Sequence, residues 1–70
     1  MEIFHLDGHE FIQLNQLLKL SGIADSGGNA NQLILNGEVN VNKETASEKR
    51  KKIRAGDFIQ VGDAIVAVEA

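Results

Sequence analysis

The sequence predicts a single α+β domain in which two helices pack on one face of a small, mostly antiparallel sheet of four to five strands. Three observations predict this fold. Apolar residues recur at helical spacing in two stretches of the first half, and they alternate with polar residues, as in half-buried strands, in the second half. Turn pairs containing glycine separate these segments. The chain of 70 residues is long enough for one domain only.

The first helix is predicted over about residues 10–20, after a short strand over residues 2–6 and the turn pair Asp7-Gly8. Glu10 in the first turn and Lys19 in the last turn both suit the helix dipole. The apolar stripe of this helix consists of Phe11, Leu14, Leu17 and Leu18.

The second helix is predicted to begin at Asp25 or Ser26, because a short side-chain oxygen there accepts a hydrogen bond from a free amide one turn later. Ala30, Leu33 and Ile34 form its apolar stripe. The pair Asn36-Gly37 ends it with a residue that tolerates positive φ.

Strands are predicted over residues 38–42, 58–61 and 64–69, the last two joined by a hairpin turn at Gly62-Asp63. Residues 43–46 read as a polar connection. Residues 47–53 are expected to be extended, with Lys49, Lys51 and Ile53 on one side, before a turn at residues 55–57. The three aromatic residues, Phe4, Phe11 and Phe58, fall where the core is expected.

The composition argues against several classes of protein. Without cysteine the chain forms no disulfide and no thiolate zinc site. No apolar run approaches the roughly 20 residues of a membrane span, and no secretory signal is visible, so we expect a cytoplasmic domain with no membrane partner. So small a chain hardly encloses a pocket of several hundred Å³ as well as a core.

No grouping of residues indicates catalysis, and we expect no enzyme activity and no cofactor. His5, Asp7 and His9 stand at alternate positions and are candidate metal ligands. The turn chemistry of Asp7-Gly8 is a sufficient reason for that sequence, so no metal site is predicted.

The main functional signal is the basic segment, residues Lys49–Arg54. It holds five of the seven cations, and the rest of the chain has two cations against ten carboxylates. Lysines also protect sheet edges, and charge runs are commonly solvated faces. Charges that serve solubility alone are interspersed with both signs, however. Their segregation favours phosphate binding, which clustered Lys and Arg drive by releasing condensed counterions from a nucleic acid.

Gly27-Gly28, at the start of the second helix, is a second candidate. Glycine costs up to about 1 kcal/mol against alanine inside a helix, so the pair requires an explanation. Either it forms a flexible loop or a tight helix–sheet approach, or its bare amides bind an anion at the helix N-terminus. Asn31 and Gln32 on the same helix have uncharged side-chain amides that can donate hydrogen bonds to a nucleic acid. The alternative is that they belong to an ordinary polar helix face.

The order of these features resembles the RNA-binding domain named after small-subunit ribosomal protein S-four, also called the alpha-L motif. Residues 23–42 read IADSGGNANQLILNGEVNVN, and residues 52–61 read KIRAGDFIQV. The resemblance covers about residues 12–61. It is strongest to free-standing, single-domain bacterial members, which share the Ser-Gly-Gly-x-Ala start and the cations before Lys-Ile.

The resemblance implies one domain over residues 1–70 that binds structured RNA, either ribosomal or transfer RNA, with the ribosome or its associated proteins as further partners. It implies an RNA surface composed of the start of the second helix and the basic strand or loop 49–54. The predicted contact residues are Gly27, Gly28, Asn31, Gln32, Lys43, Lys49, Arg50, Lys51, Lys52 and Arg54.

The sequence departs from the family pattern at two places. Family members usually carry Arg or Lys at the start of the second helix, whereas residues 26–36 contain no cation. The position after Val41-Asn42 is usually Gly, and here it is Lys43. We therefore expect RNA affinity to depend mainly on the basic segment.

Two alternatives come from another class. The first alternative is a non-catalytic protein-interaction module, because an acidic protein partner suits the basic segment as well as RNA does. The second is a ubiquitin-like carrier, since an acidic chain that begins with a strand and contains Gly56-Asp57-Phe58-Ile59 also resembles small sulfur carriers. Such carriers need a C-terminal Gly-Gly, and this chain ends in Val68-Glu69-Ala70.

Overall fold

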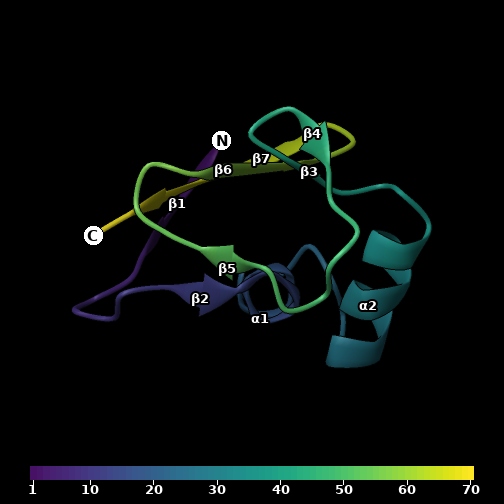
Figure 1. Ribbon diagram of the computed structural model, residues 1–70, viewed down its shortest axis with the longest axis horizontal. Helices are drawn as coiled ribbons and strands as arrows, with labels where there is room; N and C mark the ends of the chain where they lie inside the picture. The colour runs from purple at the N-terminus through teal and green to yellow at the C-terminus, as the bar shows by residue number, and fades with distance from the viewer.

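A computed structural model describes all residues from 1 to 70. Its strands and helices follow one another as β1 (Glu2–His5), β2 (Ile12–Gln13), α1 (Leu14–Leu20), α2 (Gly27–Leu35), β3 (Asn40–Val41), β4 (Glu44–Thr45), β5 (Lys52–Ile53), β6 (Phe58–Val61) and β7 (Ala64–Glu69). Figure 1 shows both helices on one side of the larger sheet, with the β2–β5 pair beside α1. Neither helix is long and apolar enough to cross a membrane.

Helix α1 is shorter than its apolar stripe predicts, because it begins at Leu14 and not at Glu10. Residues 12 and 13 form β2 instead, in register with β5. Strand β5 supplies backbone partners there, which favours an extended chain over another turn of helix. Glu10 therefore lies outside the helix, and its expected role at the helix dipole is wrong, whereas Lys19 does occupy the last turn.

Helix α2 agrees with the prediction at both ends. The Ser26 hydroxyl accepts a hydrogen bond from the Asn29 amide at 3.1 Å, as an N-cap does. Asn36 is the C-cap, and Gly37 follows at φ +75°, a left-handed conformation that glycine adopts at little cost.

The larger sheet has five strands in the order β1-β7-β6-β3-β4. All its pairs are antiparallel except β1 with β7, and the hairpin from β6 to β7 turns at residues 62–63 as predicted. The prediction missed β2 and β4, which have only two residues each. These strands carry no alternating pattern, and only their partners in space define them.

The core lies between the helices and the inner face of the larger sheet. Its 14 buried residues are all apolar, and no polar or charged residue is buried. The helix residues Leu14, Leu17 and Leu18 are fully inaccessible. The three aromatic residues are not among the buried residues: all are half-buried, and of the three only Phe4 packs against the core. The expectation that they form the core is wrong, because aliphatic side chains already fill the space between the layers.

Strands β3 and β4 are joined by the tight turn Asn42-Lys43. Both residues have positive φ, +51° and +74°, as the two central residues of a type I′ turn require. Asparagine tolerates this conformation, but for most side chains it costs about 1–2 kcal/mol. Lys43 is therefore strained at a position where glycine is favourable.

Replacement of Lys43 tests this strain. We expect Lys43→Gly to raise the free energy of unfolding by about 0.5–1 kcal/mol, since relief of the left-handed strain exceeds the entropy that glycine adds to the unfolded chain. Lys43→Ala is the matched control, because it also removes the charge but keeps the strained Cβ. Urea denaturation of the three proteins measures the difference, and equal midpoints for the Gly and Ala variants would contradict strain at residue 43.

Candidate nucleic-acid interface

The main chain of the basic segment is fixed to the start of α1. The carbonyl of Lys51 accepts a hydrogen bond from the Leu14 amide at 2.9 Å, and the carbonyl of Lys49 accepts one from the Asn15 amide at 3.0 Å. Ile53 is fully buried below them and pairs with Ile12. Because a helix leaves its first amides without intrahelical partners, the basic segment caps α1 in place of a side chain.

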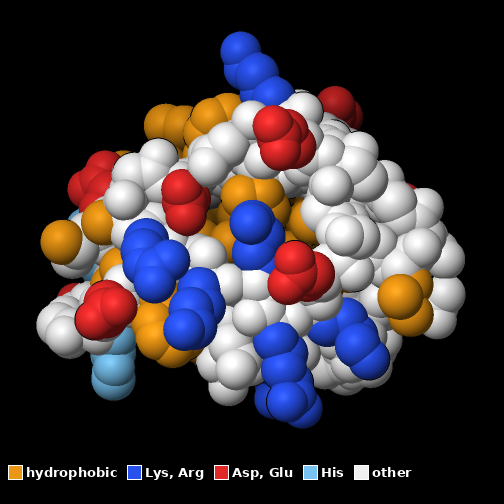
Figure 2. All heavy atoms as spheres, in the orientation of Figure 1, with side chains coloured by type: hydrophobic (Ala, Val, Ile, Leu, Met, Phe, Trp, Pro, Cys, Tyr) orange, Lys and Arg blue, Asp and Glu red, His pale blue; other side chains and the backbone are white.

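The side chains of all five cations in the segment are exposed. Figure 2 shows Lys and Arg side chains gathered over β5 and the loop that precedes it. The predicted alternation is wrong here: Lys49 and Lys51 are exposed, whereas Ile53 is buried. The chain turns at residues 49–50 to bring its carbonyls to α1, so only residues 52–53 are a strand.

Two cations of the segment lie over the ring of Phe11. The Lys52 Nζ is 4.9 Å from the ring centroid, and the Arg54 Cζ is 6.0 Å from it. The negative face of an aromatic ring attracts cations at such distances. Arg54 also has the Glu10 carboxylate 3.8 Å away, but both side chains are largely exposed and the ion pair contributes little. Phe11 thus orients the end of the basic segment, a role that sequence reasoning missed.

A polar bridge connects the basic segment to the turn that carries Lys43. The Asp57 carboxylate accepts hydrogen bonds from the Arg54 amide at 2.8 Å and from the Asn42 side-chain amide at 2.9 Å. The Asn42 side-chain oxygen accepts a third bond from the Phe58 amide. The bridge therefore fixes the main chain of the turn relative to that of Arg54, and the Lys43 side chain on this turn is exposed.

Gly27 and Gly28 are the first two residues of α2, and their amides donate no hydrogen bond. Neither residue has positive φ. A Cβ at Gly27 would meet no atom within 4 Å, and one at Gly28 would meet only the Ser26 hydroxyl at 3.8 Å. The tight approach between helix and sheet is therefore excluded as the reason for these glycines, and two bare amides remain at an open helix start.

Asn15 connects α2 to the basic segment. Its backbone amide bonds to Lys49, and its side-chain amide donates to the Asn31 side-chain oxygen at 3.2 Å. Asn31 is thus half-buried in the contact between the helices, while Gln32 is exposed and donates to Asn36 at 2.9 Å. The structure brings the side chain of Asn31 toward the basic segment through a residue that no sequence pattern indicates.

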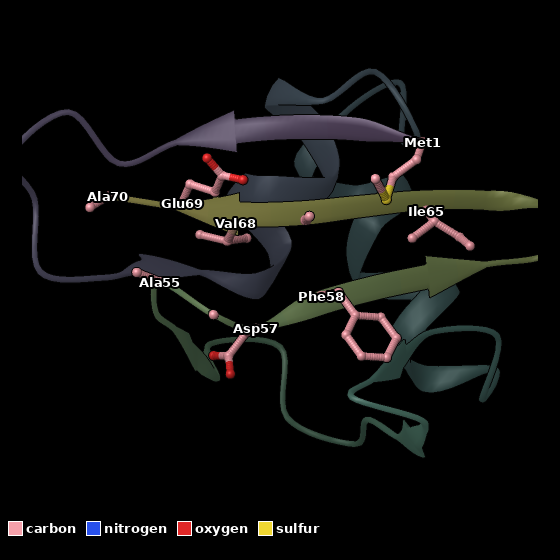
Figure 3. A pocket seen from close by; sticks show the side chains of 10 residues that line it. Met1, Ala55, Asp57, Phe58, Ile65, Val68, Glu69 and Ala70 are labelled. Carbon is pink, nitrogen blue, oxygen red and sulfur yellow. The ribbon is translucent and has the colours of Figure 1, made fainter.

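A separate groove lies on the outer face of the sheet. It is lined by apolar side chains that include Met1, Phe58 and Ile65, together with the carboxylates of Asp57 and Glu69 (Figure 3). No Lys or Arg lines it. Polyanions are therefore attracted to the basic segment and not to this face. Elsewhere, no three His, Asp or Glu side chains lie close enough together to hold a metal ion.

Comparison with known proteins identifies the family. A model described as the S4 domain matches residues 4–69. The chain is 37% identical over 70 residues, all of both chains, to the "Putative RNA-binding protein YbcJ" of Escherichia coli (strain K12). It is 36% identical over 52 residues to the "Probable ribosome maturation protein RlbA" of Bacillus subtilis (strain 168), a match that covers 74% of this chain and 73% of the relative.

The fold agrees with these matches. The solution structure of YbcJ from E. coli, described as revealing an alpha-L motif involved in RNA binding, superimposes with a TM-score of 0.78. That alignment covers all of this chain and 89% of the other, at 37% identity. The match to a family model over nearly the whole chain favours this fold over the ubiquitin-like alternative. The chain belongs to the S4 domain family.

Proposed function

We propose that this chain is a non-catalytic domain, formed by residues 1–70, that binds structured RNA. The observation that carries the proposal is the basic segment, whose main chain is fixed by α1 and β2 while its five cations remain exposed. A rigid main chain places charges without a large ordering cost on binding. The name of the E. coli relative supports RNA as the ligand, and the words "ribosome maturation" in the name of the B. subtilis relative favour ribosomal over transfer RNA.

The proposed surface has a charged half and an uncharged half. Lys49, Arg50, Lys51, Lys52 and Arg54 neutralise phosphates, and Lys43 adds a charge from the β3–β4 turn. Strain of the kind seen at Lys43 persists at functional sites, where the surrounding structure enforces it. Contact of this side chain with phosphate explains why a lysine stands where glycine would be more stable.

The uncharged half is the start of α2. The amides of Gly27 and Gly28 have no hydrogen-bond partner within the protein and lie at the positive end of a helix, where an anion is favourable. Gln32, exposed on the same helix, offers hydrogen bonds to phosphate or 2′-hydroxyl groups. Asn31 holds this half to the other through Asn15, so we assign it a positioning role beside any RNA contact.

The salt dependence of binding tests the charged half. If four or five cations meet phosphates, log K for a structured RNA falls with log salt at a slope of about −3 to −4. We expect Lys52→Ala to reduce the magnitude of this slope by about 1. Lys19→Ala is the matched control, since Lys19 lies at the far end of α1. Fluorescence anisotropy at several salt concentrations measures the slopes, and no binding at about 50 mM salt would contradict the proposal.

Replacement of Gly28 tests the uncharged half. Because a Cβ fits there, Gly28→Ala is expected to raise the free energy of unfolding, by up to about 1 kcal/mol, through its higher helix propensity. The same methyl group keeps a phosphate away from the amides, so RNA affinity falls although the protein is more stable. Leu35→Ala, at an exposed position in the last turn of α2, controls for general changes to the helix. If Gly28→Ala binds RNA with unchanged affinity, the start of α2 is not part of the RNA surface.

A protein partner at the basic segment remains the competing function. An acidic protein meets the same charges, and pull-down with and without nuclease treatment separates the two cases. Capture that survives nuclease favours the protein partner.

A further inference from the structure

A hollow of about 470 Å³, larger than we expect for so small a chain, lies between the β1–β2 loop and α1 and reaches the basic segment at Phe11. We name it the α1 hollow. Its lining contains no Lys or Arg. The lining combines the apolar side chains of Phe11 and Leu20 with the polar side chains of His5, His9, Gln13 and Gln16. It is thus unsuited to phosphate but offers both apolar surface and hydrogen-bonding groups.

The fold does not account for several of these side chains. Gln13 is half-buried and Gln16 is exposed, yet neither side-chain amide makes a hydrogen bond within the protein. Leu20 is 66% exposed at the end of α1, although it is large and apolar. Both side-chain amides are free to bond to a ligand, and ligand sites combine apolar surface with a few polar groups that fix orientation.

Phe11 links the hollow to the cations. It borders the hollow, and its ring also lies under Lys52 and Arg54. A phosphate held by these two cations therefore lies next to the mouth of the hollow. The group that enters is then the part of a nucleotide that carries no charge.

We propose that the α1 hollow takes the base of a single unpaired nucleotide from the RNA bound by the basic segment. A nucleobase is flat and neutral, with apolar faces and hydrogen-bonding edges, and the hollow has ample volume for one. Proteins commonly recognise RNA by stacking splayed bases on aromatic or histidine side chains. Phe11 and His9 supply rings here, and Gln13 and Gln16 supply donors and acceptors for the base edge. The Asp7 carboxylate at the same hollow repels a phosphate and leaves the base as the group admitted.

This inference rests on the proposed RNA binding, and it narrows the ligand to RNA stems that carry an unpaired nucleotide. The test compares a short, fully paired RNA hairpin with the same hairpin carrying one unpaired nucleotide in its stem, each of the four bases in turn. Stacking of one base on an aromatic side chain increases affinity by about tenfold. We expect at least one bulged hairpin to bind about tenfold more tightly than the paired one.

Variants of the lining residues test whether the preference for a bulged hairpin arises at the α1 hollow. Gln16→Ala and Phe11→Leu are both expected to reduce the ratio of the two affinities several-fold toward one. Gln60→Ala is the matched control, because Gln60 lies on β6 in the larger sheet and bonds to Gly62. We expect its ratio to equal that of the unaltered protein.

The outcomes separate this inference from the proposed function. Equal binding of all hairpins, with a steep salt dependence, overturns the base site and leaves RNA binding at the basic segment intact. A preference for the bulge that Gln16→Ala and Phe11→Leu leave unchanged also overturns the α1 hollow as its site. If no hairpin binds, both proposals fail.

Discussion

The proposed RNA surface depends on the contact between the basic segment and the first turn of α1. Two backbone hydrogen bonds, from Leu14 to Lys51 and from Asn15 to Lys49, satisfy amides for which the helix has no side-chain cap. Each such bond contributes about 1 kcal/mol net, but an unpaired amide costs more than that when it is buried. The burial of Ile53 adds an apolar anchor below the cations. The same contact therefore caps the helix and fixes the main chain of the basic segment.

This arrangement allows an acidic protein to attract a polyanion. The chain has a net charge of −3, but salt screens charges over about 8–10 Å, so the cations act locally. The remaining features of the site lower stability: a lysine with positive φ in the β3–β4 turn and two glycines at the start of α2. In a domain expected to have only about 3–5 kcal/mol of stability, such features are costly and call for a functional reason.

The sequence predicted the layers of the fold because its strongest patterns are those of the core. The stripe of Leu14, Leu17 and Leu18 predicted α1, and the Ser26 cap and Gly37 predicted the bounds of α2. It did not predict β2 and β4, because residues 12–13 lie within the helical stripe and residues 44–45 include no apolar side chain, so only the partners in space define these strands. The apolar Phe11 extended the helical stripe and made the helix appear to begin four residues early.

The contacts that shape the proposed RNA surface are likewise not visible in the local sequence. Clustering made the five cations of the basic segment visible in the sequence. Phe11, beneath Lys52 and Arg54, and Asn15, bonded to Lys49, act through contacts that no local pattern encodes. The Asn42–Asp57 bridge likewise joins residues 15 positions apart. Local sequence thus reveals which charges are available, and tertiary structure decides how they are held.

The most direct test of the proposed RNA surface is a map of backbone amide chemical shifts as structured RNA is added at low salt. The two halves of the proposed surface are linked through Asn15, so residues 26–32 and 43–54 should respond together and at the same RNA concentration. The part of the outer groove that makes no hydrogen bond to this surface, around Ile65 and Glu69, should not respond. Shifts confined to the basic segment, or centred on the groove around Phe58 and Ile65, would contradict a surface composed of both halves.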